Sequence, residues 1–529
     1  MKPKSKLILA LVGLSVLVSF FYAEEDWRGW HAWQTFKQQE EAKGEKFDLP
    51  SFVPKPVPDD QNFALTPLVA SCYARYLDNR GHRIRPENTN VVNRLEMKIG
   101  AIKDTWEGNT NTLGDWRKAA KTNLKSWQEY YRTPPVTNYY SAGTNEFPMT
   151  PSPQPAAADV LLALSKFNSA VEELRQAASQ RPYSRFPLNY EAASPTEILL
   201  PHLYAFEDCA QVLQLRAVAE LADTQIENAL ADIELVLRLS DSIRDEPGFY
   251  SQLVRLELAG LSIQPIWEGL AEHKWSDGQL AKFEQSLVKL NVVAGYPFAI
   301  RSERALNLAA VEFMRRNRSR AWDCIPVITY LGRGNSYEPP DGMDYAHPFM
   351  QTLTASLVPS GWFYQSEMTI GRIYQPSLPS SNGNGMELVS SAAHRAGKML
   401  ENERRHVSPY NAVAIMICPY FGRLAERFVF TQSSLDLARV ACALERYHIA
   451  QGEYPGTLDE LAPQIIKNIP HDTINGQPLH YRRTNDGQFV LYSVGWNETD
   501  DGGVVVMTQG SSSFIDWNKG DWVWHYPAK

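Results

Sequence analysis

The start of the chain constrains its fold and location more than any other feature. The first six residues contain three lysines, an uncharged apolar run covers residues 7–23, and three acidic residues follow directly. A basic segment followed by an apolar run is typical of chains that enter the export pathway. Because positive charge precedes the run and negative charge follows it, we expect the N-terminus inside and the bulk of the chain outside the membrane.

The apolar run can act as an uncleaved anchor or as a cleaved signal peptide. Cleavage favours a small residue three positions before the cut, and a cut after Ala23 would place Phe21 there. The aromatic cluster at residues 20–22 also suits a membrane interface. These flanks favour an anchor over a signal peptide, and both over a buried core helix. We therefore predict a single-pass protein of the cytoplasmic membrane, with most of the chain on the outer, periplasmic or extracellular, side.

Size, charge and cysteine content narrow the possible classes of protein. At 529 residues the chain exceeds the size of one hydrophobic core, so we expect two or more packed units. The net charge of -8 and the lack of a basic stripe argue against nucleic-acid binding, which needs clustered lysine and arginine. The cysteines form no CxxC pair and no zinc-type pattern with histidine. They are Cys72, Cys209, Cys324, Cys418 and Cys442.

Four segments follow one another along the chain. Residues 1–23 form the anchor or signal segment, and residues 24–60 combine a juxtamembrane helix with a proline-rich stretch. This stretch is either a stiff spacer between membrane and body or an extended segment that lies along the body surface. Residues 61–430 form a mostly helical body, and residues 431–529 form a small C-terminal α+β module with an antiparallel hairpin. The predicted fold class is therefore mainly α, with the body a helical bundle or an irregular α-array.

The helical body is predicted from the spacing of its apolar residues. Residues 202–246 contain neither glycine nor proline, and their apolar residues recur every three to four positions, as in amphipathic helices. The turn between two antiparallel helices is predicted at Asp223-Thr224. Ser276 and Gln279 form a capping box that predicts a further helix start. The polar, tryptophan-bearing residues 67–138 are also predicted to be largely helical.

Residues 332–385 differ from the rest of the body. They are rich in glycine, proline and serine and show little periodicity. Long irregular segments inside a compact domain are usually functional loops or linkers. We therefore predict a lid or a partner-binding loop with an exposed aromatic group at residues 362–364. The alternative is an ordered coil that packs over the helical body.

The C-terminal module carries consistent local signals. Ser433-Ser434 predicts the cap of its first helix. Thr457 and Glu460 form a capping box for a short helix after a Tyr-Pro turn. Residues 479–483 and 489–494 are strand-like runs that an Asn-Asp-Gly sequence connects, which is a strong hairpin signal.

Short motifs extend across the whole module. A third strand is predicted over residues 504–507, after a glycine-rich acidic loop at residues 495–503. The motifs are Gly452-x-Tyr454-Pro455, Leu458-x-x-Leu461, Ile469-Pro470-x-Asp472, Gly476-x-Pro478-x-x-Tyr481 and Phe489-x-Leu491-Tyr492-Ser493-x-Gly495. In this order they resemble the C-terminal globular domain of the major pseudopilin of type II secretion, over about a sixth of the chain. The start typical of that family, a cleavage glycine followed by Phe-Thr-Leu-x-Glu, is missing. The resemblance therefore implies an envelope location and an interaction role, not assembly into a pilus.

The resemblance also implies a calcium site in the acidic loop. Carried over by position, the ligands would be the backbone of Leu491 and the side chains of Ser493, Asn497, Asp500 and Asp501. Hard oxygen ligands on a glycine-rich turn suit Ca²⁺. The loop departs from the family in two ways, because Asn497 stands where the family has an aspartate and the loop is several residues shorter. The alternative is a solvated turn, since aspartate and glycine favour turns on local grounds.

No motif in the sequence predicts an active site. HExxH, Gly-x-Ser-x-Gly, Walker and dinucleotide-binding motifs are all missing. Glu403-x-x-His406 and Glu445-x-x-His448 match the ligand spacing of di-iron bundles, but chance alone can produce such pairs and a di-iron site needs two further carboxylates. We therefore predict no catalytic and no cofactor-binding residues.

Two functions remain compatible with the sequence. The first is a membrane-anchored interaction or scaffold protein that binds other envelope proteins. The second is an exported, hydrolase-like enzyme with a site between the helical body and residues 332–385. A deep cleft lined by several carboxylates or histidines would favour the enzyme.

Overall fold

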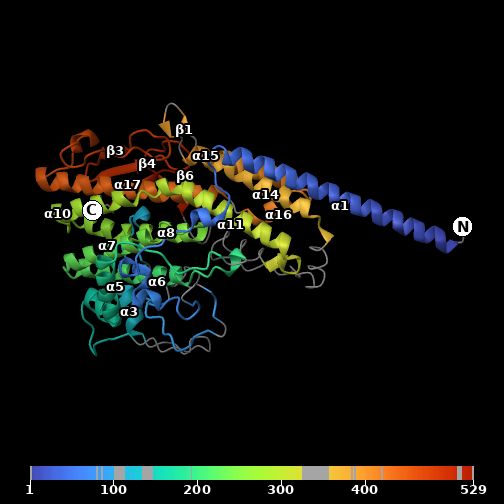
Figure 1. The fold of residues 1–529 in the computed structure, drawn as a ribbon. Helices are drawn as coiled ribbons and strands as arrows, with labels where there is room; N and C mark the ends of the chain where they lie inside the picture. Colours follow the sequence, from blue (N-terminus) through green and yellow to red (C-terminus); the bar gives the residue numbers. More distant parts are fainter. Residues whose placement is uncertain are drawn as a thin grey trace.

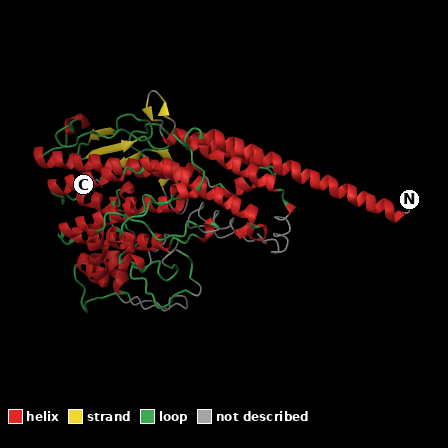
Figure 2. Ribbon diagram, viewed as in Figure 1, coloured by secondary structure: helices red, strands yellow, loops and turns green. Residues whose placement is uncertain are grey.

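The computed structural model is mainly helical, with a small antiparallel β unit near the C-terminus (Figure 2). This arrangement confirms the predicted fold class. The described residues are 3–78, 82–84, 87–100, 113–133, 147–191, 194–323, 357–379, 381–382, 385–386, 389–418, 421–508 and 515–526. Residues 332–356 of the predicted lid or loop, and Cys324, lie outside them.

The longest helix, α1, projects from one end of the body (Figure 1). It spans Pro3–Glu41 without a break between the predicted anchor and the predicted juxtamembrane helix. Most of the large apolar side chains between residues 8 and 21 are exposed. By length and composition, α1 is the one candidate for a membrane span in the described part of the chain. The structure thus confirms a long apolar helix near the N-terminus.

The second half of α1 packs along α14, which spans Ser360–Tyr374 (Figure 1). The expectation of an irregular segment is wrong for these residues, and so is the exposed aromatic group, because Phe363 is buried against the body. Trp362 donates its Nε1–H to Glu25 Oε2 at 2.9 Å. Contact with α1 therefore orders a segment whose own composition disfavours a helix.

The body contains two hydrophobic cores, which agrees with the expectation of more than one packed unit. One core lies mainly under α2 to α6, and the other joins α8 to α17 and the β unit. The helices are α2 (Pro67–Ala70), α3 (Leu124–Arg132), α4 (Ala156–Leu164), α5 (Asn168–Gln180), α6 (Pro201–Ala222), α7 (Ile226–Ser242), α8 (Phe249–Leu261), α9 (Ile263–Ala271), α10 (Asp277–Leu290), α11 (Tyr296–Arg316), α15 (Val389–Arg405), α16 (Ala412–Ile417) and α17 (Phe421–Gln451).

The predicted helix pair and the predicted helix start in the body are both present in the structure. α6 and α7 form the predicted pair, with Asp223-Thr224 in the turn between them. The capping box of Ser276 and Gln279 opens α10 as predicted. Residues 67–133 differ, because their described parts are mostly turns around α2, α3 and one short 3-10 helix. There the burial of Trp127 and its neighbours, and not helix periodicity, decides the path of the chain.

The proline-rich stretch lies along the body surface, which is the second of its two predicted arrangements. Its first residues form a 3-10 turn at Leu49–Phe52. The ring of Phe52 packs against Phe298 with centroids 6.2 Å apart. Pro54 O accepts a hydrogen bond from Arg185 Nε at 2.9 Å. The body is therefore connected to α1 by an ordered segment.

The helix α17 connects the body to the C-terminal module. It begins at Phe421, so the predicted cap at Ser433-Ser434 is wrong and residue 430 lies inside the helix. Ser434 Oγ donates to Phe430 O at 2.8 Å, which satisfies the hydroxyl within the helix. Because side chains of α17 and of the sheet belong to one core, the module packs directly on the body.

The module contains a three-stranded antiparallel sheet in the order β3-β4-β7. The predicted hairpin is present, with Tyr481 opposite Leu491. The third strand of the sheet is β7, whereas β5 pairs with β6, so residues 504–507 do not extend the hairpin as expected. The strands are β3 (His480–Arg483), β4 (Phe489–Ser493), β5 (Val505–Met507), β6 (Ile515–Gly520) and β7 (Trp522–Trp524), with β1 (Ser381–Asn382) and β2 (Gly385–Met386) forming a separate small hairpin.

Candidate functional site

Three of the five predicted calcium ligands lie on the acidic loop, where Asn497 contacts Asp501 and the Asp500 carboxylate contacts Tyr492 and His480. Asp501 Oδ2 accepts a hydrogen bond from Asn497 Nδ2 at 2.9 Å. Asp500 Oδ1 accepts from Tyr492 OH at 3.0 Å and from the N–H of Gly502 at 2.9 Å. These bonds lower the pKa of Asp500, with the Gly502 N–H the largest cause, so its carboxylate is charged at neutral pH.

The other two predicted ligands, Leu491 and Ser493, belong to the central strand β4. Ser493 is buried, and its Oγ donates to Asp472 Oδ1 at 2.8 Å instead of pointing at a loop carboxylate. Asp472 also accepts from the N–H of Val494 at 2.9 Å. Ser493 and Asp472 thus fix the end of β4 to the turn that precedes β3.

The acidic loop is shaped by a carboxylate that the sequence did not point to. Asp521, just before β7, accepts backbone N–H bonds from Asp501, Gly503 and Val504 at 3.2, 2.6 and 3.2 Å. Burial raises the pKa of Asp521, and these three bonds oppose that rise. A carboxylate that holds three loop amides lies beside the predicted calcium ligands and adds negative charge to the loop.

Calcium binding at the acidic loop is expected to raise the melting temperature of the full-length protein. Binding only to the native state stabilises it, by about 2.7 kcal/mol at a concentration 100 times the Kd. The measurement is a thermal melt in calcium and in EGTA, with the double variant Asp500→Asn/Asp501→Asn as control. Equal melting temperatures for the native protein in both conditions would contradict the calcium prediction.

A cleft of about 700 Å³ lies between the body and the C-terminal module. It is lined by acidic and basic residues from several elements, namely Asp115, Arg117, Glu257, Glu426 and Arg427. Arg117 Nε pairs with Asp115 Oδ1 at 2.7 Å. Desolvation of Glu257 by the surrounding protein raises the pKa of its carboxyl, and the positive charge of Arg427 opposes this rise. The cleft has the volume of a ligand site and a mixed-charge lining.

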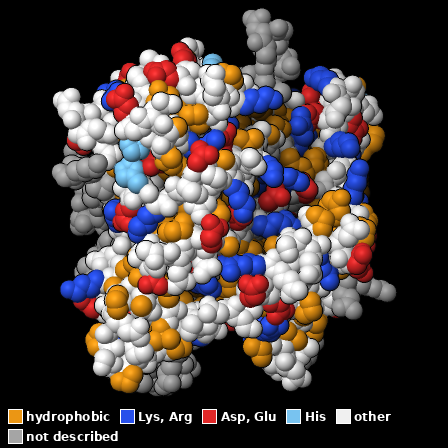
Figure 3. Space-filling view, turned by 90° about the vertical axis from the view of Figure 1, so that its left-hand side faces the viewer, with side chains coloured by type: hydrophobic (Ala, Val, Ile, Leu, Met, Phe, Trp, Pro, Cys, Tyr) orange, Lys and Arg blue, Asp and Glu red, His pale blue; other side chains and the backbone are white. Residues whose placement is uncertain are grey.

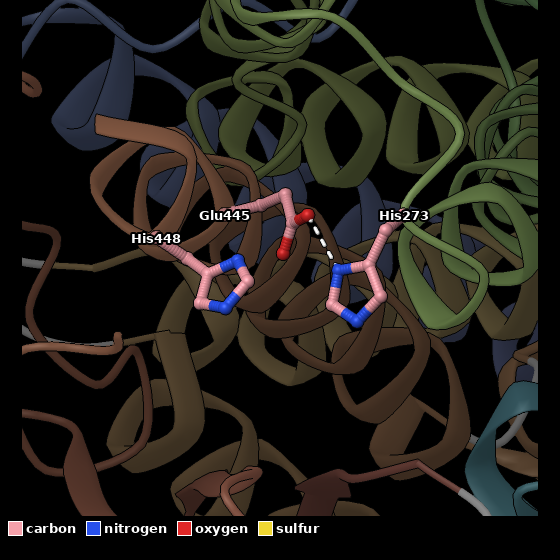
Figure 4. Close-up of side chains that lie close together, drawn as sticks. All are labelled: His273, Glu445 and His448. Atoms are coloured by element: carbon pink, nitrogen blue, oxygen red, sulfur yellow. Dashed lines mark hydrogen bonds and ion pairs between the residues drawn. The ribbon is translucent and has the colours of Figure 1, made fainter. Parts of the chain in front are cut away.

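A cluster of two histidines and one glutamate lies at the C-terminal end of α17 (Figure 4). Glu445 and His448 stand three residues apart on the last turns of α17, so their side chains share one face. His273 comes from the turn between α9 and α10. The ligand atoms of the three side chains lie within 4.8 Å of one another.

The cluster combines one buried carboxylate with two more accessible rings. Glu445 is 2% exposed and its Oε1 lies 2.7 Å from His273 Nδ1. The rings of His273 and His448 stack with centroids 5.2 Å apart. Tyr454 stacks on His448 at 4.7 Å and donates its hydroxyl to Glu445 Oε2 at 2.8 Å. Two imidazoles and a carboxylate are a ligand set for a transition metal.

The sequence shows two of the three residues of this cluster as a spaced pair. The Glu445-x-x-His448 spacing is visible in the sequence, but His273 lies 172 residues from Glu445. The matching pair Glu403-x-x-His406 forms no such group among the described residues. There Glu403 Oε2 accepts from Asn411 Nδ2 at 2.8 Å, so this pair serves the turn after α15. The spacing alone therefore could not separate the two pairs.

The face opposite the N-terminus is uneven in charge and shape. Figure 3 shows histidine side chains gathered at one place on this face and, apart from them, a hollow in which acidic and basic side chains meet.

No family model, no curated protein and no solved structure matches the chain. The likeness of the C-terminal module to a pseudopilin therefore stays a prediction from its motifs.

Proposed function

We propose that the protein is a membrane-anchored, outward-facing envelope protein with an interaction or scaffold role. In this proposal α1 crosses the cytoplasmic membrane once, and the body with its pseudopilin-like module stands on the outer side. Other envelope proteins are the proposed partners. Calcium in the acidic loop is a proposed but not required component.

The observation that carries this proposal is the rigid connection between α1 and the body. One unbroken helix contains both the exposed apolar half and the half that packs along α14. A flexible linker would let the body move freely, whereas a docked helix fixes the direction of the body relative to its anchor. This geometry suits a protein that presents one end at a set distance from the membrane.

The proposed topology predicts which introduced thiols a membrane-impermeant maleimide labels in intact cells. The background variant is Cys324→Ser, because the four described cysteines are buried and free: Cys72, Cys209, Cys418 and Cys442. In that background Thr499→Cys, in the exposed acidic loop, is expected to be labelled. Ser5→Cys, before the apolar run, is expected to react only after the cells are opened.

The reverse labelling pattern would contradict the proposed orientation. Recovery of the whole protein in the soluble periplasmic or secreted fraction would instead indicate a cleaved signal peptide. The interaction role predicts a native mass above that of the monomer after mild solubilisation. A uniform monomer under those conditions would argue against a scaffold.

The second candidate function, an exported hydrolase-like enzyme, is favoured by the cleft alone. The cleft is lined by Glu257 and Glu426 together with two arginines, and its lining includes none of the described residues of the 332–385 segment. A raised pKa lets a carboxyl keep its proton to a higher pH, which favours a role as general acid. Turnover of chromogenic ester or glycoside substrates by the purified protein would favour this reading over the scaffold.

A further inference from the structure

His273 lies at a turn position whose backbone favours glycine. Its φ is 51°, its N–H donates to Leu270 O at 3.1 Å, and the N–H of Lys274 donates to Gly269 O at 2.9 Å. A helix that ends this way usually has glycine at the left-handed position, because a Cβ is unfavourable there. Strained positions of this kind gather at functional sites. The choice of histidine here points to its side chain, whose Nδ1 faces Glu445.

Glu445 is oriented as metal-binding carboxylates usually are. Such a carboxylate normally has an outer hydrogen-bond partner that fixes its direction. Here the partner is Tyr454, which holds Oε2 and leaves Oε1 toward His273.

His448 completes the cluster from the same helix as Glu445. In the described part of the chain, its ring makes stacking contacts with His273 and Tyr454 but no hydrogen bond from either nitrogen. The neighbouring Arg446 fixes the helix end, because its Nε pairs with Asp277 at the start of α10 at 2.8 Å. The end of α17 and the turn before α10 are thus held together beside the cluster.

We propose that His273, Glu445 and His448 bind one divalent transition-metal ion of the zinc class. Bonds of about 2.0–2.2 Å from two nitrogens and one oxygen place the ligand atoms about 3.3 Å apart in a tetrahedral site. Since these atoms already lie within 4.8 Å of one another, small side-chain rotations are enough. The ion would replace the proton that His273 Nδ1 shares with Glu445 Oε1. Imidazole nitrogen selects this class of metal over Ca²⁺ and Mg²⁺.

The proposed ion has room for a further ligand. The side chain of His273 is 38% exposed, so the site opens to solvent. Three protein ligands with one position left for water or substrate are typical of catalytic zinc sites, whereas structural sites have four protein ligands. A bound ion would also crosslink two segments that lie 172 residues apart in the chain.

Metal binding is tested on the chelator-treated full-length protein in detergent. Co²⁺ is expected to bind with one-to-one stoichiometry and to give visible absorption bands, and Zn²⁺ to displace it and raise the melting temperature. His448→Ala and His273→Gly are expected to lose both signals. Tyr454→Phe, which removes the outer hydrogen bond, is expected to weaken binding by about 10-fold.

Two controls separate this site from other causes of metal binding. His406→Ala removes an exposed histidine with the same Glu-x-x-His spacing and is expected to bind Co²⁺ like the native protein. Asp500→Asn/Asp501→Asn is also expected to bind normally, which separates this site from the acidic loop. Each variant is compared with itself with and without metal, so a change in its basal stability does not affect the result. Absence of Co²⁺ binding by the native protein, or unchanged binding by His273→Gly and His448→Ala, overturns the proposal.

Discussion

Gly361→Ala is expected to destabilise the protein by about 3 kcal/mol, at the upper end of the usual cost of overpacking. A Cβ at Gly361 would collide with the backbone carbonyl of Glu25 on α1. Backbone atoms cannot move aside as a flexible side chain does, so the two helices must separate. The measurements are the midpoint of thermal unfolding and the rate of hydrogen exchange in α14, which should rise in the variant.

The separation would also break a polar contact at the start of α14. The N–H of Gly361 donates to Asp26 Oδ1 at 2.7 Å, so an acidic side chain of α1 satisfies the N-terminus of α14. On α1 the facing residue is Gly29, where an added Cβ would meet the backbone of Gly361. The two glycines thus let the helices approach closely, and their loss affects the connection between the anchor and the body.

Gly397→Ala in α15 provides the matched control. An added Cβ at Gly397 has no heavy atom within 4 Å, apart from its own chain neighbours and helix backbone. Because alanine is the better helix former, this variant is expected to gain up to about 1 kcal/mol. The two glycine-to-alanine changes are therefore expected to shift the free energy of unfolding in opposite directions. A gain in stability at Gly361 would contradict the close helix packing.

Local signals explain what the sequence could predict. The capping boxes at Ser276 and Thr457 are both present, because each depends on residues only three positions apart. The hairpin β3-β4 likewise follows from a short turn between two strands. Such elements could be placed correctly because their causes lie within a few residues of sequence.

Helix α14 shows why other elements could not be predicted. Its two glycines, Gly361 and Gly371, made the segment look irregular. In the fold each glycine makes space for α1, since a Cβ at Gly371 would meet the ring of Phe36. The residues that weakened the local helix signal are the ones that allow the tertiary contact, and that contact is invisible without the partner helix.

The candidate sites follow the same rule. Glu445 and His448 could be found by their spacing, but His273 joins them only through the packing of α10 against α17. In the acidic loop, Asp500 and Asp501 were visible as a local cluster. Asp521 was not, because it reaches that loop only after β6 returns along β5. In each site the residues close in sequence could be predicted, and the residue that long-range packing adds could not.

Glu45→Ala is expected to destabilise the protein by about 3–5 kcal/mol, because it removes one partner of a buried ion pair. Glu45 binds two arginines of α11, with Oε1 2.8 Å from Arg301 Nη2 and Oε2 2.6 Å from Arg304 Nη2. The Arg304 side chain is fully buried, so its charge would lose its carboxylate partner. Thermal or denaturant unfolding measures the loss. Glu41→Ala is the control. The Glu41 side chain is 44% exposed and its Oε1 lies 3.7 Å from Lys37 Nζ, so the loss of this surface ion pair should cost less than about 1 kcal/mol.

The same carboxylate predicts how stability depends on pH. Burial alone would raise the pKa of Glu45, but hydrogen bonds from Arg301 and Arg304 outweigh it and hold the pKa below its ordinary value. A group with a lowered folded-state pKa contributes stability above its unfolded pKa of about 4.3, and this is lost as pH falls through the folded-state value. The native protein should therefore lose stability in that acidic range more steeply than Glu45→Gln, which cannot titrate. Parallel stability curves for the two proteins below neutral pH would show that Glu45 is not the charged partner that holds the segment after α1 to α11.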